Sequence, residues 1–133
     1  MDSEVLELTT GGRLTTDITA AAADFCRGRG DGLLQAFVPH ATAGIAIFET
    51  GAGSEEDLDL ILESLLPRSA AYLHRHGSPG HGRDHVLPAL IAPSITVPVL
   101  KGRMQLGTWQ SLVFVDPTVD NPHRQVRLSF LAG

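Results

Sequence analysis

The feature of this sequence that most constrains its fold is the placement of its strand-like segments, which gather towards the two ends of the chain. Short apolar or alternating runs predict strands over residues 4–10, 14–16, 33–38, 44–49, 95–100, 111–116 and 124–131. Helical patterns lie mainly between these two groups. Because strands and helices do not alternate strictly, the order predicts an α+β fold with a largely antiparallel sheet.

The clearest helix is expected over residues 54–66, where one apolar stripe recurs at helical spacing. The stripe consists of Leu58, Ile61, Leu62, Leu65 and Leu66. Ser54 is expected to cap the amino end of this helix, and Pro67 to close it. Further helices are expected over residues 17–29 and 86–91, a helical turn over 70–74, and a loop over 76–84 because of its glycines and prolines.

Length and composition restrict the class of protein. The 133 residues predict a single domain over 1–133, and the net charge of −5 without a basic block argues against nucleic-acid binding. No apolar run reaches the length of a membrane span, and no secretory signal is visible. The only cysteine, Cys26, cannot form an internal disulfide, which fits a reducing compartment, so a cytoplasmic location is expected.

Four of the six histidines fall in the short stretch from His74 to His85, which also contains His76 and His81. Neutral imidazole is a good ligand for zinc-like ions. The spacing favours a site made of His74 with one or both of His81 and His85, completed by His40 from another element. Three histidines with an open position are typical of catalytic zinc. The alternative is a solvated polar loop, and His76 and His123 are interpreted as surface residues.

Two further groups of residues are candidates for a site. Glu49, at the end of an expected strand, is either a general base, a support for a metal-bound histidine, or a solvated residue. The segment Gly107-Thr-Trp-Gln holds the only tryptophan. We expect Trp109 to pack, and Thr108 and Gln110 to point polar groups towards the site. A core tryptophan at the start of a strand is the alternative.

Several of these residues recur in an order that resembles the YjbQ family, whose members are described as secondary thiamine-phosphate synthases. The motifs are His40-x-Thr-Ala-Gly-Ile, Glu49, Asp57, Leu65-Leu-Pro67, Tyr72-x-His74, His85, Ile95-x-Val-Pro98-Val, Gly102-x-x-x-Leu-Gly-Thr-Trp-Gln110 and Arg124. The resemblance covers most of the chain, from about Gly32 to Gly133.

The resemblance implies a two-sheet, mostly antiparallel β-sandwich with helices packed on it, assembled as a homotrimer. It also implies a bound metal, which maps onto His40, His74 and His85 with His81 nearby. The expected catalytic residues are Glu49, Thr42, Gln110 and Arg124. Family members usually carry an Asn- and Asp-rich stretch before the last of these histidines. Here residues 80–84 replace it, so a substitute role for His81 or Asp84 stays open.

The implied activity is the coupling of hydroxymethylpyrimidine pyrophosphate with thiazole phosphate. The expected cofactor is a divalent metal ion, with a zinc-like ion favoured by the histidines and Mg²⁺ by the pyrophosphate chemistry. The expected ligand is a small-molecule phosphate substrate, with no nucleic acid and no membrane as partners. Two alternatives remain: a metal-dependent hydrolase of a phosphate or ester, and a non-catalytic trimeric protein that binds a metal or ligand.

Overall fold

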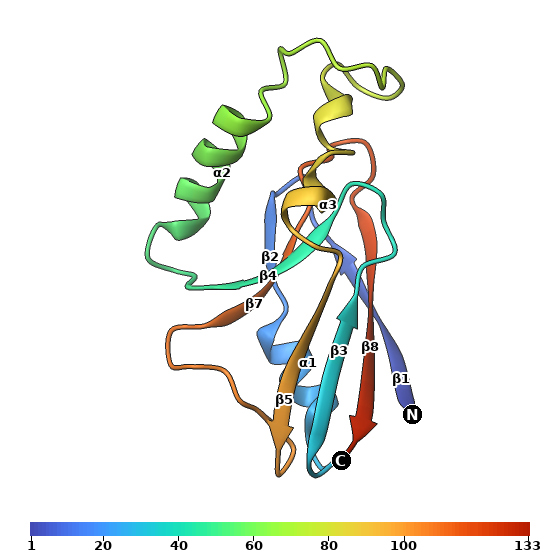
Figure 1. Ribbon diagram of the computed structural model, residues 1–133, viewed down its shortest axis with the longest axis vertical. Coiled ribbons are helices and arrows are strands. Elements are labelled where there is room, and N and C mark those ends of the chain that lie inside the picture. Colours follow the sequence, from blue (N-terminus) through green and yellow to red (C-terminus); the bar gives the residue numbers. More distant parts are fainter.

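The strands at the two ends of the chain pair with one another, and this pairing builds the fold. A computed structural model describes residues 1–133 as two antiparallel sheets and three α-helices (Figure 1). The larger sheet has the order β1-β8-β3-β5-β6, and the smaller has the order β2-β7-β4. The strands are β1 (Asp2–Thr9), β2 (Thr15–Asp17), β3 (Gly32–Phe37), β4 (Gly44–Phe48), β5 (Ser94–Leu100), β6 (Arg103–Met104), β7 (Ser111–Val115) and β8 (His123–Ala132).

The main core lies between the two sheets. Leu34 on β3 lies opposite both Phe130 on β8 and Val97 on β5, and all three side chains are buried. Phe114 of the smaller sheet and Phe25 of α1 (Thr19–Cys26) complete the same cluster. Burial of side chains of this size stabilises a fold by about 1.5–3 kcal/mol each. The two antiparallel sheets and their helices confirm the predicted α+β architecture.

A second layer covers the outer face of the smaller sheet. Alternate residues of β7 point to opposite faces, so Val113 and Val115 leave the main core and pack against Leu62 and Leu87. These two leucines belong to α2 (Ser54–Leu65) and α3 (Leu87–Leu90). The smaller sheet is thus enclosed on both faces, and α2 runs along one side of the molecule (Figure 1).

The ends of two helices differ from the sequence prediction. The residue that caps α2 is Gly53, at φ 98°, and Ser54 is already inside the helix without a side-chain cap. Helix α1 begins only at Thr19 because the Asp17 carboxylate accepts the backbone N–H of Thr19, at 2.9 Å. Gly28 follows α1 in a left-handed conformation, so the helix stops short of the expected residue 29.

The apolar stripe of α2 is only partly buried. Leu62 and Leu66 are buried, whereas Ile61 and Leu65 remain 56% and 62% exposed. The helix rests on the small sheet along one narrow line, so the outer half of its stripe has no partner in the chain. Strand β5, which contains Pro98, is paired with the two-residue β6 only through Val99 and Leu100.

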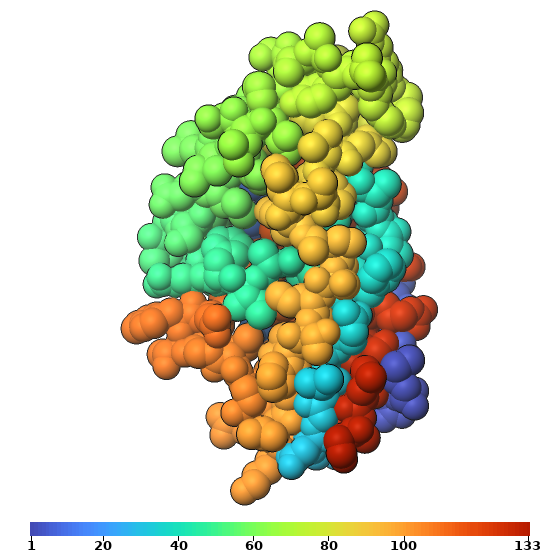
Figure 2. All heavy atoms as spheres, in the orientation of Figure 1, coloured from blue at the N-terminus to red at the C-terminus, as the bar shows by residue number.

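The segment between α2 and α3 forms one end of the molecule, at the top of Figures 1 and 2, away from both termini. The helical turn expected over residues 70–74 is absent, and this stretch is irregular with bends at Ala70 and Leu73. The expected loop over 76–84 instead contains a short 3₁₀ helix, η1 (His81–Arg83). No helix has the length and apolar character needed to cross a membrane.

Candidate metal centre

Glycines allow the segment before α3 to fold back tightly on itself. Gly77 has φ 83°, and a Cβ atom there would lie 2.7 Å from both the Asp120 carboxylate and the His81 ring. At Gly82, a Cβ would lie 2.5 Å from Tyr72 Cβ and 2.7 Å from the backbone oxygen of His74. Neither position has room for a side chain, so these glycines bring separate parts of the loop together.

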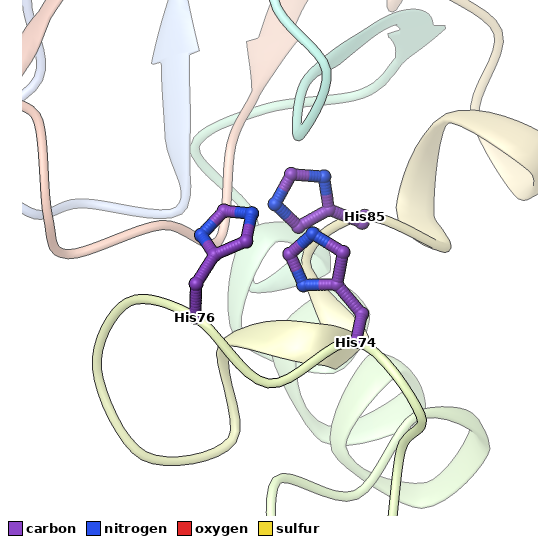
Figure 3. Close-up of side chains that lie close together, drawn as sticks. All are labelled: His74, His76 and His85. Carbon is purple, nitrogen blue, oxygen red and sulfur yellow. The ribbon is translucent and has the colours of Figure 1, made fainter.

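Three imidazoles meet where the loop folds back. His74, His76 and His85 each offer a ring nitrogen, and these nitrogens all lie within 4.8 Å of one another (Figure 3). The ring centroid of His74 is 4.0 Å from that of His76 and 3.9 Å from that of His85. His74 and His76 come from the loop after α2, and His85 comes from the turn before α3. One ion can therefore be reached by all three side chains.

His81 supports this group from behind. Its Nδ1 lies 3.0 Å from the Asp84 carboxylate, and its Nε2 lies 3.0 Å from Nε2 of His85. An ionised carboxylate only accepts, so His81 Nδ1 carries a proton and, in the neutral ring, Nε2 accepts. His85 then donates from its own Nε2 and keeps a lone pair on Nδ1. Asp84 and His81 thus fix the tautomer of the His85 ring.

The environment favours the neutral form of His74 and His85. Burial and then the neighbouring histidines, His76 and His81, lower the pKa of His74 below its ordinary value. Burial and then His74 lower the pKa of His85 in the same direction. A neutral imidazole has the lone pair that a metal needs. In addition, His74 Nδ1 is buried and has no hydrogen-bond partner.

Asp84 is the anchor of the centre and is completely buried. Burial raises the pKa of this carboxyl group, and the neighbouring Arg68 and His81 oppose that rise. Arg68 NH1 lies 3.5 Å from Asp84, and the buried Arg83 side chain donates to Glu63 of α2 at 2.6 Å. These contacts attach η1 to the end of α2 and hold the support for His85 in place.

Two members of the histidine group, His74 and His76, line an open hollow of about 360 Å³. Its lining includes Tyr72, His74, Arg75, His76 and His81, and few apolar side chains. A hollow of this size admits a small polar molecule next to His74 and His76. Arg75 is exposed on its rim and places a positive charge there.

His40 does not belong to the histidine group, although the sequence predicted it as a ligand of the same ion as His74 and His85. Its ring instead contacts Arg124 and the backbone of Gln125. His76, interpreted as a surface residue, is exposed but takes the third position in the group. The physical reason is the turn at Gly77, which reverses the chain and brings His76 back beside His85.

Thr42 and Arg124, both expected to be catalytic, lie in a buried polar network. Arg124 Nε donates to Asp116 at 2.7 Å, and the Thr42 hydroxyl donates to the same carboxylate at 2.9 Å. Asp116 was not identified from the sequence. It directly follows an apolar strand, and a polar residue at that position is common and does not mark a site. Its partners Thr42 and Arg124 lie 74 and 8 residues away in the sequence.

Glu49 and Gln110 make no contact with the histidine group. Glu49 is exposed at the end of β4. Gln110 is exposed and accepts the backbone N–H of Gly107 at 2.7 Å, so it closes its own turn. Trp109 is 73% exposed, which contradicts the expectation that it packs. The turn before β7 projects from the sandwich, so no core surface lies within reach of the indole.

Comparison with known proteins gives a consistent assignment. The family model for "UPF0047 protein YjbQ-like" matches residues 4–133. A UPF0047 protein of Mycobacterium tuberculosis is 59% identical over 133 residues, which is 100% of both chains. A UPF0047 protein of Methanothermobacter thermautotrophicus is 34% identical over 85% of this chain and 79% of its own.

Solved structures agree with the fold. A hypothetical protein from Aeropyrum pernix superposes with a TM-score of 0.90 at 29% identity, covering 100% of both chains. A protein of unknown function from Sulfolobus solfataricus gives a TM-score of 0.91 at 21% identity, over 99% of this chain and 97% of its own. At that identity the second match bears on the fold alone.

Proposed function

The chain belongs to the YjbQ/UPF0047 family, and from this premise we propose that it is a metal-dependent enzyme acting on a small phosphate-bearing substrate. The proposed metal ligands are His74, His76 and His85. The observation that carries the proposal is the convergence of their ring nitrogens within 4.8 Å. The unpaired, buried Nδ1 of His74 fits the same role, because a buried polar atom without a partner is costly unless a ligand satisfies it.

Three imidazole nitrogens suit a zinc-like ion better than Mg²⁺, which prefers oxygen ligands. When bound, such an ion supplies Lewis-acid stabilisation of negative charge that develops on a phosphate oxygen. Within the chain, Asp84 orients His81, and His81 in turn fixes the ring of His85. Arg75, on the rim of the hollow, offers a charge-assisted contact to an anionic substrate.

The leading reaction is the one implied by the family resemblance, the coupling of hydroxymethylpyrimidine pyrophosphate with thiazole phosphate and release of pyrophosphate. In this reaction the departing pyrophosphate would lie beside Arg75, on the rim of the hollow. We infer a zinc-like ion as the natural partner of this donor set, so Mg²⁺ alone is expected to support less activity.

The test combines metal analysis with product detection. Protein stripped with a chelator is reloaded with Zn²⁺ or Mg²⁺ and incubated with the two precursors. Thiamine phosphate formed only after reloading supports the synthase proposal. His74→Ala is expected to lose both metal and product, whereas the matched control His123→Ala keeps both, because His123 is exposed on β8 outside the group. Product from metal-free protein would contradict the proposal.

A second candidate, hydrolysis of a phosphate or ester, is favoured by one observation. Two of the three imidazoles, His74 and His76, line an open hollow, which leaves space for a substrate and a water molecule together. Metal-dependent release of phosphate from simple esters, without coupling of the thiamine precursors, would select this activity. Metal binding without any turnover would select the third candidate, a protein that only binds a metal or ligand.

We also propose that the chain forms a homotrimer in the cytoplasm. Large apolar side chains remain exposed in the single chain, among them Trp109, Leu60 and Leu65, and assembly would remove such surface from water. The unpaired, buried Cys26 is compatible with a reducing compartment. Light scattering that gives the mass of one chain at every concentration would contradict the trimer.

A further inference from the structure

The imidazole of His40 is held in one tautomer by the main chain. The backbone N–H of Gln125 donates to His40 Nε2 at 2.9 Å. A backbone amide can only donate, so Nε2 must present its lone pair. The single proton of the neutral ring therefore lies on Nδ1. Burial and then the charge of Arg124 lower the pKa of His40, which keeps the ring in this neutral form.

A second donor faces that proton. Arg124 NH1 lies 3.3 Å from His40 Nδ1. The guanidinium group stays protonated in proteins and has no acceptor atom. The N–H groups of His40 Nδ1 and Arg124 NH1 thus lie next to each other, and neither can accept a hydrogen bond from the other. An acceptor atom beside them would receive a hydrogen bond from each.

The rest of Arg124 is occupied and fixed. Its Nε donates to Asp116 at 2.7 Å, and its NH2 donates to the Thr42 hydroxyl at 3.2 Å. The Thr118 backbone N–H also donates to Asp116, at 3.0 Å, so the carboxylate cannot swing away. Arg124 is only 9% exposed, and NH1 is the one guanidinium nitrogen without a protein acceptor. The pair of donors is therefore preorganised.

From this arrangement we propose that His40 Nδ1 and Arg124 NH1 together bind one oxygen of an anionic ligand group, a phosphate or a carboxylate. In this geometry His40 offers no free lone pair to a metal, because one ring nitrogen carries a proton and the other accepts from Gln125. His40 is only half-buried and its neighbours Ala41 and Gln125 are exposed, so the pair of donors lies near the molecular surface.

The anion site and the histidine group are joined by one short segment. At its start, Asp116 holds Arg124, and at its end the Asp120 carboxylate accepts the Ser78 backbone N–H at 3.1 Å and lies 3.3 Å from His81 Nδ1. Four residues span at most about 14 Å of chain. An anionic substrate group held at His40 would thus be linked to the histidine group through this one short segment. This substrate assignment rests on the proposed function, but anion binding by itself does not.

The test uses metal-free protein, so that it is independent of the metal centre. Nitrogen-15 spectra of the histidine rings are recorded while inorganic phosphate or acetate is added, and the two titrations separate phosphate from carboxylate recognition. We expect the His40 proton on Nδ1 before addition, and a shift of that resonance on binding. His40→Ala is expected to weaken binding roughly 10- to 100-fold, the loss of one hydrogen bond to a charged group.

Two controls separate this proposal from the metal centre. His123→Ala should bind the anion as the parent does, and His74→Ala should lose zinc but keep anion binding. The proposal is overturned if the His40 proton lies on Nε2, if neither anion binds, or if His40→Ala binds both with unchanged affinity. Because the tautomer is read on the unaltered chain, a His40 variant that fails to fold does not decide the question.

Discussion

The Asp84 carboxylate offers the most specific perturbation of the metal centre. It is completely buried and lies 3.0 Å from His81 Nδ1, and it fixes the tautomer that leaves His85 with a free lone pair. In Asp84→Asn, the charged acceptor is replaced by a neutral amide of nearly the same shape. The His81–His85 pair loses its electrostatic anchor, so His85 should bind a metal less well.

The size of the effect follows from this single contact. A hydrogen bond to a charged group contributes about 1.5–3 kcal/mol, which corresponds to roughly 10- to 150-fold in an equilibrium constant. Mutation of a residue that hydrogen-bonds to a metal-bound histidine typically lowers metal affinity by about 10- to 100-fold. We therefore expect Asp84→Asn to weaken zinc binding by one to two orders of magnitude.

The assay is a competition titration of zinc against a coloured chelator, with thermal melting to verify the fold. Asp120→Asn is the matched control, because Asp120 also faces His81 Nδ1, at 3.3 Å, but is partly exposed. It should weaken binding no more than about threefold, as for a solvent-screened contact. The tautomer argument is refuted if Asp84→Asn binds zinc as the parent does, or if the two variants lose affinity equally.

Three further predictions concern other parts of the structure. Because the folded-state pKa values of His74 and His85 are lowered, the unfolded chain binds more protons near pH 6, so the melting temperature of metal-free protein should rise as pH increases from about 5 to 7; a falling temperature would contradict the shifts. Gly82→Ala should cost more than tenfold in zinc affinity, because its Cβ would collide with Tyr72; an unchanged zinc titration would show that the loop adapts. Trp109→Ala should change the free energy of unfolding of a single chain by less than about 0.5 kcal/mol, against about 3–5 kcal/mol for the buried Phe114→Ala, as denaturant titration at low protein concentration can measure; equal losses would place Trp109 in a core.

The sequence predicted the sheets well because their pattern is local. The alternation of Val126, Leu128 and Phe130 on β8 is repeated in the structure as three buried side chains. Helix α2 was also predicted nearly in full. Its burial was overestimated, since a stripe of leucines does not reveal how wide a surface the rest of the chain offers it.

The site was predicted only in part, because its geometry depends on chain reversals. Spacing identified His74 and His85, but the left-handed turn at Gly77 brings in His76 rather than His40. The network around Asp116 joins residues far apart in the sequence, and no local pattern marks it. Packing likewise could not be inferred for Trp109, because the sequence does not show that its turn projects from the sandwich.

The most direct test of the account is the zinc content of two single-histidine variants after reconstitution and desalting, measured by elemental analysis. The family resemblance predicts an ion held by His40, His74 and His85, whereas we propose His74, His76 and His85, whose ring nitrogens converge. The account predicts about one zinc ion per chain in the parent and in His40→Ala, and almost none in His76→Ala. Zinc retained by His76→Ala and lost from His40→Ala would contradict it.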